Sequence, residues 1–258
     1  HPAMGGEVAL EVVRSEVAAG ASFARRFEAD AARIARMEHP HLIALHDYWR
    51  DPSGAFLVSR WVSGGALGTS IRRNSWRIDA VARLVDQIAS ALSVAHRYGV
   101  MHGGVTFDSI QLDEDDNAYL GYFPIGRDRA ASDDDARVDV RALAMVALGA
   151  LTGELDPSPV PATAPGGVTD AVFGVIRRAV EPGGNGFADV AEFGGAFLAS
   201  TAEHPDGPTT EASAPANPYK GLRAFGETDA ADFFGRDVAV SELVDAVARH
   251  RLVAVVGP

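Results

Sequence analysis

The side chains that could hold a metal ion or move a proton are histidines and carboxylates, and their spacing is the first evidence about chemistry. His39, His41 and His46 lie within one short segment, and imidazole is a common ligand of zinc. The segment has the pattern of a strand and a turn, and no carboxylate stands at the spacing of a metal site. The acidic runs Asp113–Asp116 and Asp133–Asp135 are typical of solvated loops. These patterns predict no metal site.

The composition limits the classes of function. The chain has 258 residues, 47% hydrophobic and 22% charged, which is ordinary for a soluble globular protein with one domain and part of another. No apolar run approaches the roughly 18 residues of a membrane span. The net charge of -12 argues against nucleic acid as a partner. The absence of cysteine excludes disulfides and thiolate metal sites and fits the reducing cytoplasm, where we expect the protein. One predicted helix has a basic face, expected to be solvated, formed by Arg25, Arg26, Arg33 and Arg36.

The first part of the chain predicts a small sheet and one helix. Alternating β-branched residues over Glu7–Val13 predict a strand. Ser22–Glu38 has apolar residues at helical spacing and stops before His39-Pro40, as a helix should. Two further strands are predicted over Leu42–Tyr48 and Ala55–Val62.

From residue 63 onward the pattern becomes mainly helical. The longest amphipathic stretch is Asp79–Tyr98, with Asp79 as the candidate N-cap and Gly99 just past its end. Two short strands flank a hairpin turn at Asp113–Asn117. The other predicted helices are Leu67–Arg73, Asp139–Leu151, Thr169–Val180 and Phe187–Ala199.

The composition changes again after Ser200. Residues 201–218 are rich in Pro, Thr, Ala and Ser, which is typical of a linker. A new pattern follows, with a predicted helix at Val238–His250 and an apolar strand at Arg251–Val256, before Gly257-Pro258. The sequence therefore predicts two domains joined by a linker.

The segment MHGGVTFDSIQLDEDDNAYLGYFPIGR, residues 101–127, resembles the catalytic loop and metal-binding hairpin of protein kinases, H-R-D-L-x-x-x-N followed by D-F-G. His102, Val105 and Phe123 keep the frame, and the offset between His102 and Tyr122 matches the family. Over residues 1–200, the order of the elements resembles bacterial Ser/Thr protein kinases. VALE looks like the V-A-I-K strand, Arg60–Val62 like the hinge that holds adenine, and Asp139–Gly153 like the buried helix that anchors the catalytic loop.

The departures from this family concern the reactive groups. The resemblance places Glu11 at the lysine that holds the phosphates and Asp30 at its glutamate partner. Two such carboxylates about 4 Å apart would repel by about 4 kcal/mol at an effective dielectric near 20. Gly104 stands where the catalytic aspartate is expected, Ser109 where the asparagine is, and Tyr122 where the D-F-G aspartate is. Phosphoryl transfer needs these groups, so the resemblance implies that no catalytic residue is left.

The segment that would hold a peptide substrate is also reduced. The interval between Tyr122 and Asp139 is short and lacks A-P-E. The arginine that pairs with the A-P-E glutamate in this family would stand at Gly186. Both ends of one ion pair are therefore missing together, and either charge alone would be costly if buried.

The end of the chain resembles a second family. Residues 217–258 look like the entry to a STAND-type NTPase of the novel bacterial subgroup, with Arg236 in its F-F-G-R-[DE] box. Gly257 would be the first glycine of the phosphate-binding loop, G-x-x-x-x-G-K-[ST]. The start enters a predicted hairpin and the end falls inside this loop, so we expect the sequence to continue at both ends.

The predicted fold class is α+β. It comprises a truncated kinase-like N-lobe (1–62), a helical C-lobe (63–200), a linker (201–218) and the first elements of an α/β P-loop NTPase (219–258). The resemblance implies a catalytically inactive regulatory or docking module on a signalling NTPase. No cofactor is expected in residues 1–200, whereas ATP and Mg²⁺ are implied for the NTPase. The expected partner is another protein or the NTPase itself, with a homo-oligomer formed through the NTPase. The alternatives are an active or atypical Ser/Thr kinase and a pseudokinase that binds nucleotide without metal.

Overall fold

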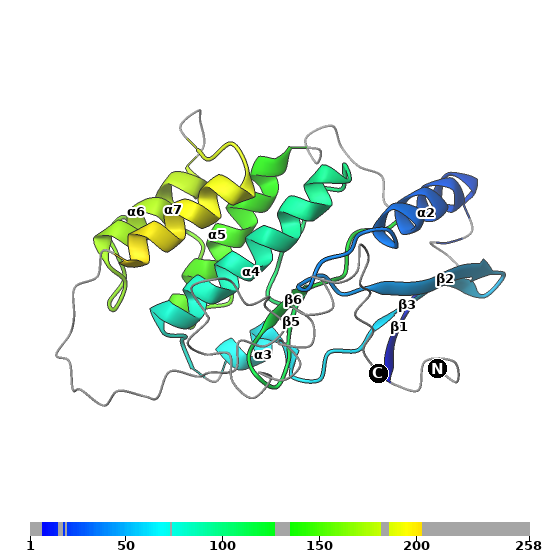
Figure 1. The fold of residues 1–258 in the computed structure, drawn as a ribbon, viewed down its shortest axis with the longest axis horizontal. Coiled ribbons are helices and arrows are strands. Elements are labelled where there is room, and N and C mark those ends of the chain that lie inside the picture. The colour runs from blue at the N-terminus through cyan, green and yellow to red at the C-terminus, as the bar shows by residue number, and fades with distance from the viewer. Residues whose placement is uncertain are drawn as a thin grey trace, which may run out of the picture. The chain divides into compact units, whose positions relative to one another are not determined.

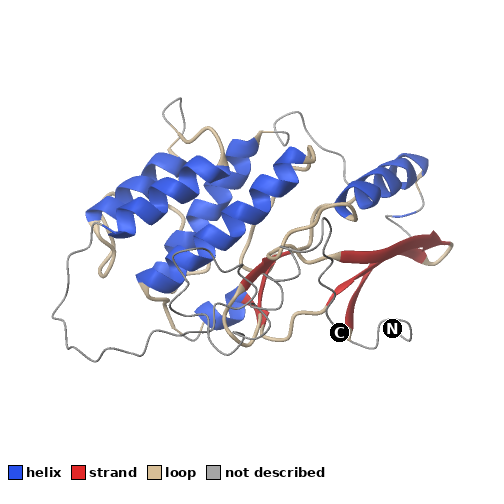
Figure 2. Ribbon diagram, in the orientation of Figure 1, coloured by secondary structure: helices blue, strands red, loops and turns tan. Residues whose placement is uncertain are grey.

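The computed structural model describes residues 7–14, 18, 20–72, 74–126, 135–181 and 186–202. The chain divides into two compact units, residues 1–205 and 206–258, and all the described residues belong to the first. Within that unit, strands and one helix gather at one end, and a group of helices forms the other (Figure 1). Figure 2 shows the same division by element type.

The strand-rich lobe is a three-stranded antiparallel sheet with the order β1-β3-β2. Its strands are β1 (Val8–Arg14), β2 (Leu45–Asp51) and β3 (Gly54–Arg60), and helix α2 (Ala21–Ile34) lies beside it (Figure 1). Phe23 and Phe27 of α2 stack at 5.7 Å, and Phe27 meets Tyr48 of β2 edge-on at 6.2 Å. This aromatic contact joins the helix to the inner face of the sheet.

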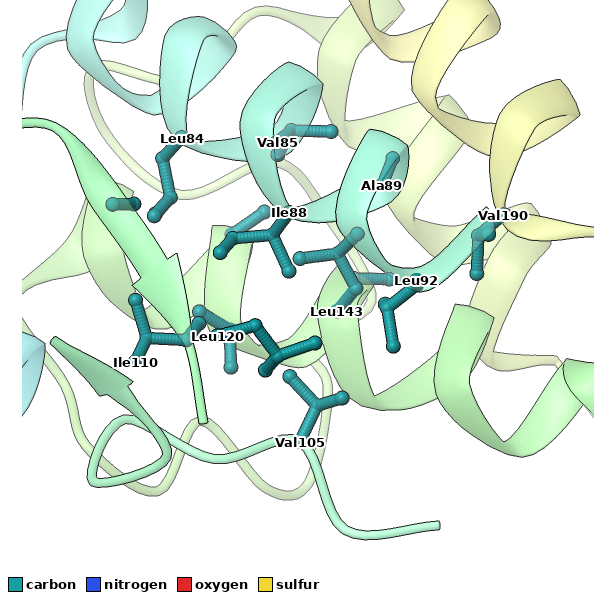
Figure 3. Packing of buried hydrophobic residues seen from close by; sticks show 14 of the residues in the cluster. Leu84, Val85, Ile88, Ala89, Leu92, Val105, Ile110, Leu120, Leu143 and Val190 are labelled. Atoms are coloured by element: carbon teal, nitrogen blue, oxygen red, sulfur yellow. The ribbon is translucent and has the colours of Figure 1, made fainter. Parts of the chain in front are cut away.

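The helical lobe is built around α4 (Ile78–Arg97) and α5 (Ala136–Thr152). From Leu143 onward α5 is apolar on nearly all sides and is largely buried, whereas α4 keeps one polar face. Around them lie α3 (Leu67–Ile71), α6 (Asp170–Val180) and α7 (Val190–Ala202). Figure 3 shows Leu84, Ile88 and Leu92 of α4 in one cluster with Leu143 of α5 and with Val105, Ile110 and Leu120.

A second small sheet carries the loops of interest. It has the order β4-β5-β6 and consists of β4 (Gly65–Ala66), β5 (Ile110–Leu112) and β6 (Ala118–Leu120). The predicted turn between β5 and β6 is present, and its Asp113 carboxylate accepts hydrogen bonds from the N–H groups of Asp115 and Asn117 and from the Tyr119 hydroxyl. These hydrogen bonds hold the pKa of Asp113 below its ordinary value, although desolvation acts in the opposite direction.

Several predicted boundaries need correction. β2 begins at Leu45 rather than Leu42, because the preceding residues pair with β6 instead: Ile43 N–H donates to Leu120 O at 2.8 Å. α4 has Arg77 as its N-cap, and Asp79 lies in the first turn. α7 begins at Val190 rather than Phe187, because the Asp189 side chain accepts the Glu192 N–H in the manner of an N-cap. Gly99 lies just past α4, as predicted, and has a positive φ of 69°.

Candidate functional site

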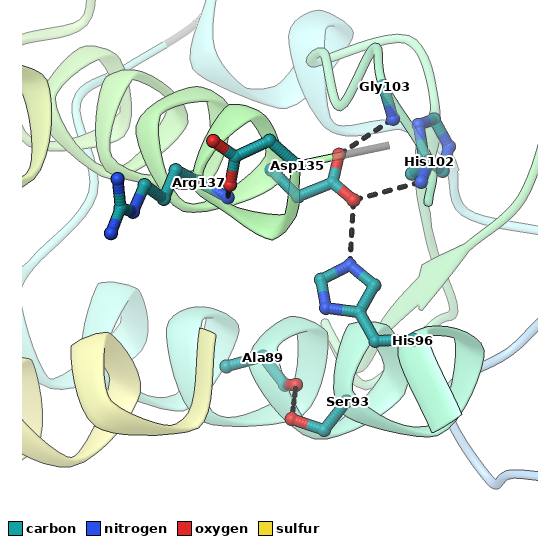
Figure 4. A network of polar contacts seen from close by, with 8 residues as sticks. Ala89, Ser93, His96, His102, Gly103, Asp135 and Arg137 are labelled. Carbon is teal, nitrogen blue, oxygen red and sulfur yellow. Dashed lines mark hydrogen bonds and ion pairs between the residues drawn. The ribbon is translucent and has the colours of Figure 1, made fainter. Parts of the chain in front are cut away.

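A single buried carboxylate holds the loop that follows α4. Asp139, in the first turn of α5, is fully buried and accepts hydrogen bonds from the backbone N–H groups of His102 at 2.9 Å and Gly103 at 2.7 Å. The ring of His96, from α4, lies 2.8 Å from the same carboxylate. Figure 4 shows His96, His102 and Gly103 converging on this group. The loop geometry is therefore fixed from beneath by α5, as predicted for this helix.

His102 links the loop to the segment after β6. Its Nε2 lies 3.0 Å from Gly121 O, to which it donates, and its ring lies 4.7 Å from the Phe123 ring. The side chain is 1% exposed, and among the described residues Nδ1 has no hydrogen-bond partner. Burial lowers the pKa of His102 below its ordinary value, more strongly than the Gly121 hydrogen bond and the Asp139 charge raise it. A neutral His102 therefore packs under the loop.

The position of the expected catalytic base has room but no side chain. Gly104 is exposed, and a Cβ built on it would meet nothing within 4 Å. The neighbouring Gly103 has a φ of 63°, a conformation that favours glycine. The missing carboxylate at Gly104 therefore cannot be attributed to crowding.

The Ser109 hydroxyl is held by hydrogen bonds within the loop. Its Oγ accepts the Thr106 N–H at 2.8 Å and donates to Thr106 O at 2.9 Å. The residue is only 5% exposed. These hydrogen bonds hold the turn before β5 and use the proton and one acceptor position of the hydroxyl, so Ser109 offers at most one lone pair to a metal ion.

Tyr122 occupies an unusual backbone conformation. Its φ is 57°, in the left-handed region that bulky side chains rarely adopt, and its side chain is 52% exposed. The residues on both sides are held firmly: Gly121 N–H donates to Ser109 O at 2.9 Å, and Phe123 is buried. The surrounding structure therefore imposes this conformation on Tyr122.

The cleft between the lobes brings together five of the predicted site positions. Glu11 of β1, Tyr122 and the hinge-like residues Arg60, Trp61 and Val62 line one cavity, with Ala9, Ile43, Ser59 and Gln111. The cavity has a volume of about 40 Å³. Small-molecule sites measure roughly 300–1,000 Å³. Arg60 does not face into a phosphate site, because its guanidinium lies over the Tyr119 ring at 4.8 Å.

Mg·ATP, the cofactor of the resembling family, does not fit these residues. A kinase holds it with a lysine, an aspartate and an asparagine, whose positions here are Glu11, Tyr122 and Ser109. Glu11 would face a triphosphate with like charge, the Ser109 hydroxyl is committed to Thr106, and Tyr122 offers no carboxylate. The side chains at these three positions therefore do not provide the groups that bind Mg·ATP.

Asp30 has a partner that the sequence did not suggest. Its carboxylate accepts the backbone N–H of Gly126 at 3.0 Å, and Arg26, one turn earlier on α2, donates from Nε to Gly126 O at 3.2 Å. Two side chains of α2 thus hold both backbone groups of one residue in the segment after Phe123. The interaction that we expected between Asp30 and Glu11 stays a prediction.

The remaining predicted positions lie elsewhere. Arg236 and Gly257 are outside the described residues. His39 lies 3.0 Å from Ser90 Oγ, and its pKa is lowered by burial and then by His41. Within the described ranges, no three His, Cys, Asp or Glu side chains are grouped so that they could hold a metal ion. Across the same ranges, no helix has the length and apolar character needed to cross a membrane.

Sequence reasoning missed three contributors to this region. His96 was placed on α4 without a role, Thr106 was not linked to Ser109, and Gly126 was not linked to Asp30. Thr106 is three residues from Ser109, a spacing typical of a local turn. Asp30 and Gly126, by contrast, are far apart in the sequence. Only the first of these two could have been found from a local pattern.

Two parts of the chain match models of known protein families. Residues 4–147 match the family model described as protein tyrosine and serine/threonine kinase. The chain belongs to this kinase family. Residues 218–258 match the model for novel STAND NTPase 1, so the two family resemblances seen in the sequence are both confirmed.

The relatives of this kinase-family chain include mycobacterial proteins. It is 34% identical over 119 residues to the serine/threonine-protein kinase PknH of Mycobacterium tuberculosis, covering 46% of this chain and 19% of PknH. It is 32% identical over 126 residues to PknL of the same organism, covering 48% of this chain and 32% of PknL. The chain thus spans between about a fifth and a third of the length of these curated relatives.

A solved structure confirms the fold. The kinase domain of M. tuberculosis PknI matches with a TM-score of 0.66 and 26% sequence identity, over 78% of this chain and 88% of that chain. The two-lobed kinase-like fold, with a short strand-rich lobe and a helical lobe, is therefore as the sequence predicted. The predicted NTPase elements lie outside the described residues.

Proposed function

We propose that the kinase-like domain does not transfer phosphate and that it serves as a regulatory or docking module for an attached STAND-type signalling NTPase. The observation that carries this proposal is the contrast within one loop. Asp139 holds the loop in place through two backbone N–H donors, with His96 of α4 on the same carboxylate, whereas Gly104, Ser109 and Tyr122 supply none of the groups that phosphoryl transfer requires. A loop that keeps the kinase-like shape but lacks the reactive groups supports a role in binding.

The proposed target of regulation is the attached NTPase. Residues 218–258 match the novel STAND NTPase 1 model, and we expect ATP and Mg²⁺ to act there rather than in the kinase-like cleft. In the proposed mechanism, a protein partner binds the kinase-like domain and shifts the population of the NTPase toward or away from an assembled, oligomeric state. Removal of residues 1–200 from the full-length protein should then change its nucleotide-dependent assembly, measured by sedimentation. Unchanged assembly would contradict the regulatory role.

The expected lack of nucleotide chemistry in the kinase-like cleft is tested on residues 1–200, which exclude the segment that matches the NTPase model. We expect no shift in Tm on addition of Mg·ATP, measured by scanning fluorimetry, and no transfer of labelled γ-phosphate to the chain or to a general protein substrate. A shift that disappears in EDTA, together with phosphate transfer, would support an active or atypical kinase. A shift that persists in EDTA would support a pseudokinase that binds nucleotide without metal.

A matched variant separates a genuine activity from a contaminating kinase. In the variant with Glu11→Ala and Tyr122→Ala, both substitutions lie in the lining of the cleft, and both side chains are exposed. Phosphate transfer that is equal in the parent chain and in this variant would arise from contamination. Transfer that is lost only in the variant would show that the cleft is active, and the proposal would then be wrong.

A further inference from the structure

A groove crosses the helical lobe on the side of α5 away from the α4 core. It consists of two adjoining hollows of about 240 and 500 Å³, which meet at Arg141, Val180 and Glu181. The first hollow lies between the start of α5 and the residues before α7, and the second lies between α5, α6 and the connection that follows α5. We call it the α5–α6 groove; its lining includes Arg137, Val138, Arg141, Met145, Pro159, Val160, Pro161, Ala162, Arg177, Val180, Glu181, Gly186 and Phe187.

The lining of this groove is basic although the chain as a whole is acidic. Arg137, Arg141 and Arg177 contribute three positive charges, against the single carboxylate of Glu181. Glu181 is already paired with Arg177, at 3.2 Å. With Arg177 and Glu181 paired, Arg137 and Arg141 leave a net positive charge inside a groove on a chain of net charge -12, and this charge is complementary to an anionic partner.

The two arginines of α5 are the groups best placed to bind an anion. Arg137 and Arg141 lie one turn apart on the helix and are both exposed. In the portion of the chain that the structure describes, neither guanidinium has a hydrogen-bond or ion-pair partner. The nearby Asp135 carboxylate accepts the Arg137 backbone N–H instead, and Figure 4 shows the Arg137 side chain directed away from the Asp139 network.

Apolar side chains line much of the rest of the groove, which is open. Val138 is 37% exposed, and Met145, Val160 and two prolines continue the apolar lining. Gly186 keeps the first hollow open, because a Cβ there would meet only Arg178 O, at 3.9 Å. This is the position where the kinase resemblance places an arginine.

We propose that the α5–α6 groove docks an acidic segment of a partner protein, with carboxylates on Arg137 and Arg141 and an apolar side chain between α5 and α6. This inference rests on the proposed docking function and names the chemistry of the partner. The guanidinium groups favour carboxylates, and the apolar lining favours a leucine-like side chain over a purely charged chain.

The experiment measures binding of a short fluorescein-labelled peptide of Glu-Glu-Leu repeats to the 258-residue chain by anisotropy. We expect saturable binding that weakens with salt, and much weaker binding of the matched Lys-Lys-Leu peptide. The double variant Arg137→Glu/Arg141→Glu should raise Kd by at least about tenfold. The control Arg25→Glu/Arg83→Glu makes the same charge change at exposed positions of α2 and α4 and should raise Kd by less than about twofold.

Two further variants test whether the effect is specific. Arg137→Lys/Arg141→Lys keeps the charge and should retain most of the binding, which also shows that α5 tolerates substitution. Ala162→Trp places a bulky side chain on the rim of the second hollow and should weaken binding of the Glu-Glu-Leu peptide more than that of a peptide of glutamate alone. Tm measurements identify any variant that fails to fold.

Several outcomes would overturn the inference. Absence of saturable binding to the Glu-Glu-Leu peptide, or equal loss in the groove and control variants, would contradict it. A dimer of the chain that dissociates in the groove variant, seen by sedimentation, would identify a second copy as the occupant instead. The peptide assay contains no nucleotide, so its result is independent of the ATP experiment. Peptide binding by a chain that also transfers phosphate would contradict only the proposed inactivity.

Discussion

At the scale of single residues, the loop holds Tyr122 in a left-handed backbone conformation that tyrosine does not favour. Its φ of 57° costs an L-residue roughly 1–2 kcal/mol, and its ring is half exposed. Asparagine adopts this conformation more readily. We therefore expect Tyr122→Asn to raise the free energy of unfolding by about 0.5–1 kcal/mol, measured by urea denaturation.

The control for this prediction is Tyr98→Asn. Tyr98 is 47% exposed but has a φ of -81°, so that substitution should bring no such gain. If Tyr122→Asn instead lowers the free energy of unfolding, the tyrosine ring contributes packing in the cleft that outweighs the backbone strain.

A second prediction at this scale concerns the pH dependence of stability through His102. Burial keeps the pKa of His102 below its ordinary value of about 6.5, so the folded chain holds this ring neutral while the unfolded chain takes up a proton. The free energy of unfolding should therefore fall as the pH drops below about 6.5, by up to about 1.4 kcal/mol per pH unit from this residue.

The variant His102→Phe isolates this contribution. It should show a shallower pH dependence than the parent chain between about pH 6.5 and 5, whatever its absolute stability, because no proton can bind at this position. His39, whose pKa is also lowered, is present in both proteins, so its effect cancels. Equal slopes in urea titrations would show that His102 is protonated in the folded state.

At the scale of elements, α5 connects the core of the helical lobe to the loop through Asp139. Asp139→Ala would leave two backbone N–H groups and the His96 ring without their shared acceptor in a buried site. We expect the free energy of unfolding to fall by about 3–5 kcal/mol, measured by urea denaturation. The control Asp79→Ala breaks only an exposed ion pair with Arg77 and should cost less than about 1 kcal/mol. Similar losses in both variants would mean that Asp139 is not the anchor of the loop.

The same elements show what the sequence could and could not predict. The apolar run of α5 and the amphipathic period of α4 are strong local patterns, and both helices are present near their predicted bounds. The start of β2 was placed too early because Leu42 and Ile43 satisfy a strand pattern equally well against β3 or β6. Strand partners depend on distant residues, which local periodicity does not contain.

The sequence predicted which residues stand at the positions of the candidate site, but it did not predict the contacts that these residues make. The spacing of the loop assigned roles to Gly104, Ser109 and Tyr122, and the resemblance to the V-A-I-K strand assigned one to Glu11. The commitment of Ser109 to Thr106 and the hydrogen bond from Gly126 to Asp30 depend on how the loop and α2 fold. Capping of α7 by Asp189, with Glu192 three residues later, was visible in the sequence and could have corrected the start of that helix.

At the scale of the whole described unit, the two lobes have very unequal cores. The strand-rich lobe has its own cluster of five buried residues, Ala18, Phe23, Phe27, Ala55 and Leu57. The helical lobe has a far larger cluster that runs through α4, α5, α6 and α7. Leu45 and Ile125 pack against both clusters and join the two lobes. Buried apolar area is the main source of stability, so the strand-rich lobe should be the weaker one.

This difference predicts partial unfolding that starts in the strand-rich lobe. In native-state hydrogen exchange, the free energy of opening for amides of β1, β2 and β3 should be lower by at least about 1–2 kcal/mol than that for amides of α4 and α5. Leu57→Ala, in the smaller cluster, should speed exchange in the sheet while leaving the opening free energy of α4 nearly unchanged. The matched variant Leu92→Ala, in the larger cluster, should speed exchange in both lobes, because the sheet packs on the helical lobe through Leu45 and Ile125. Equal opening free energies across both lobes would show instead that the chain unfolds as one cooperative unit, and a partner bound to either lobe would then stabilise the whole domain.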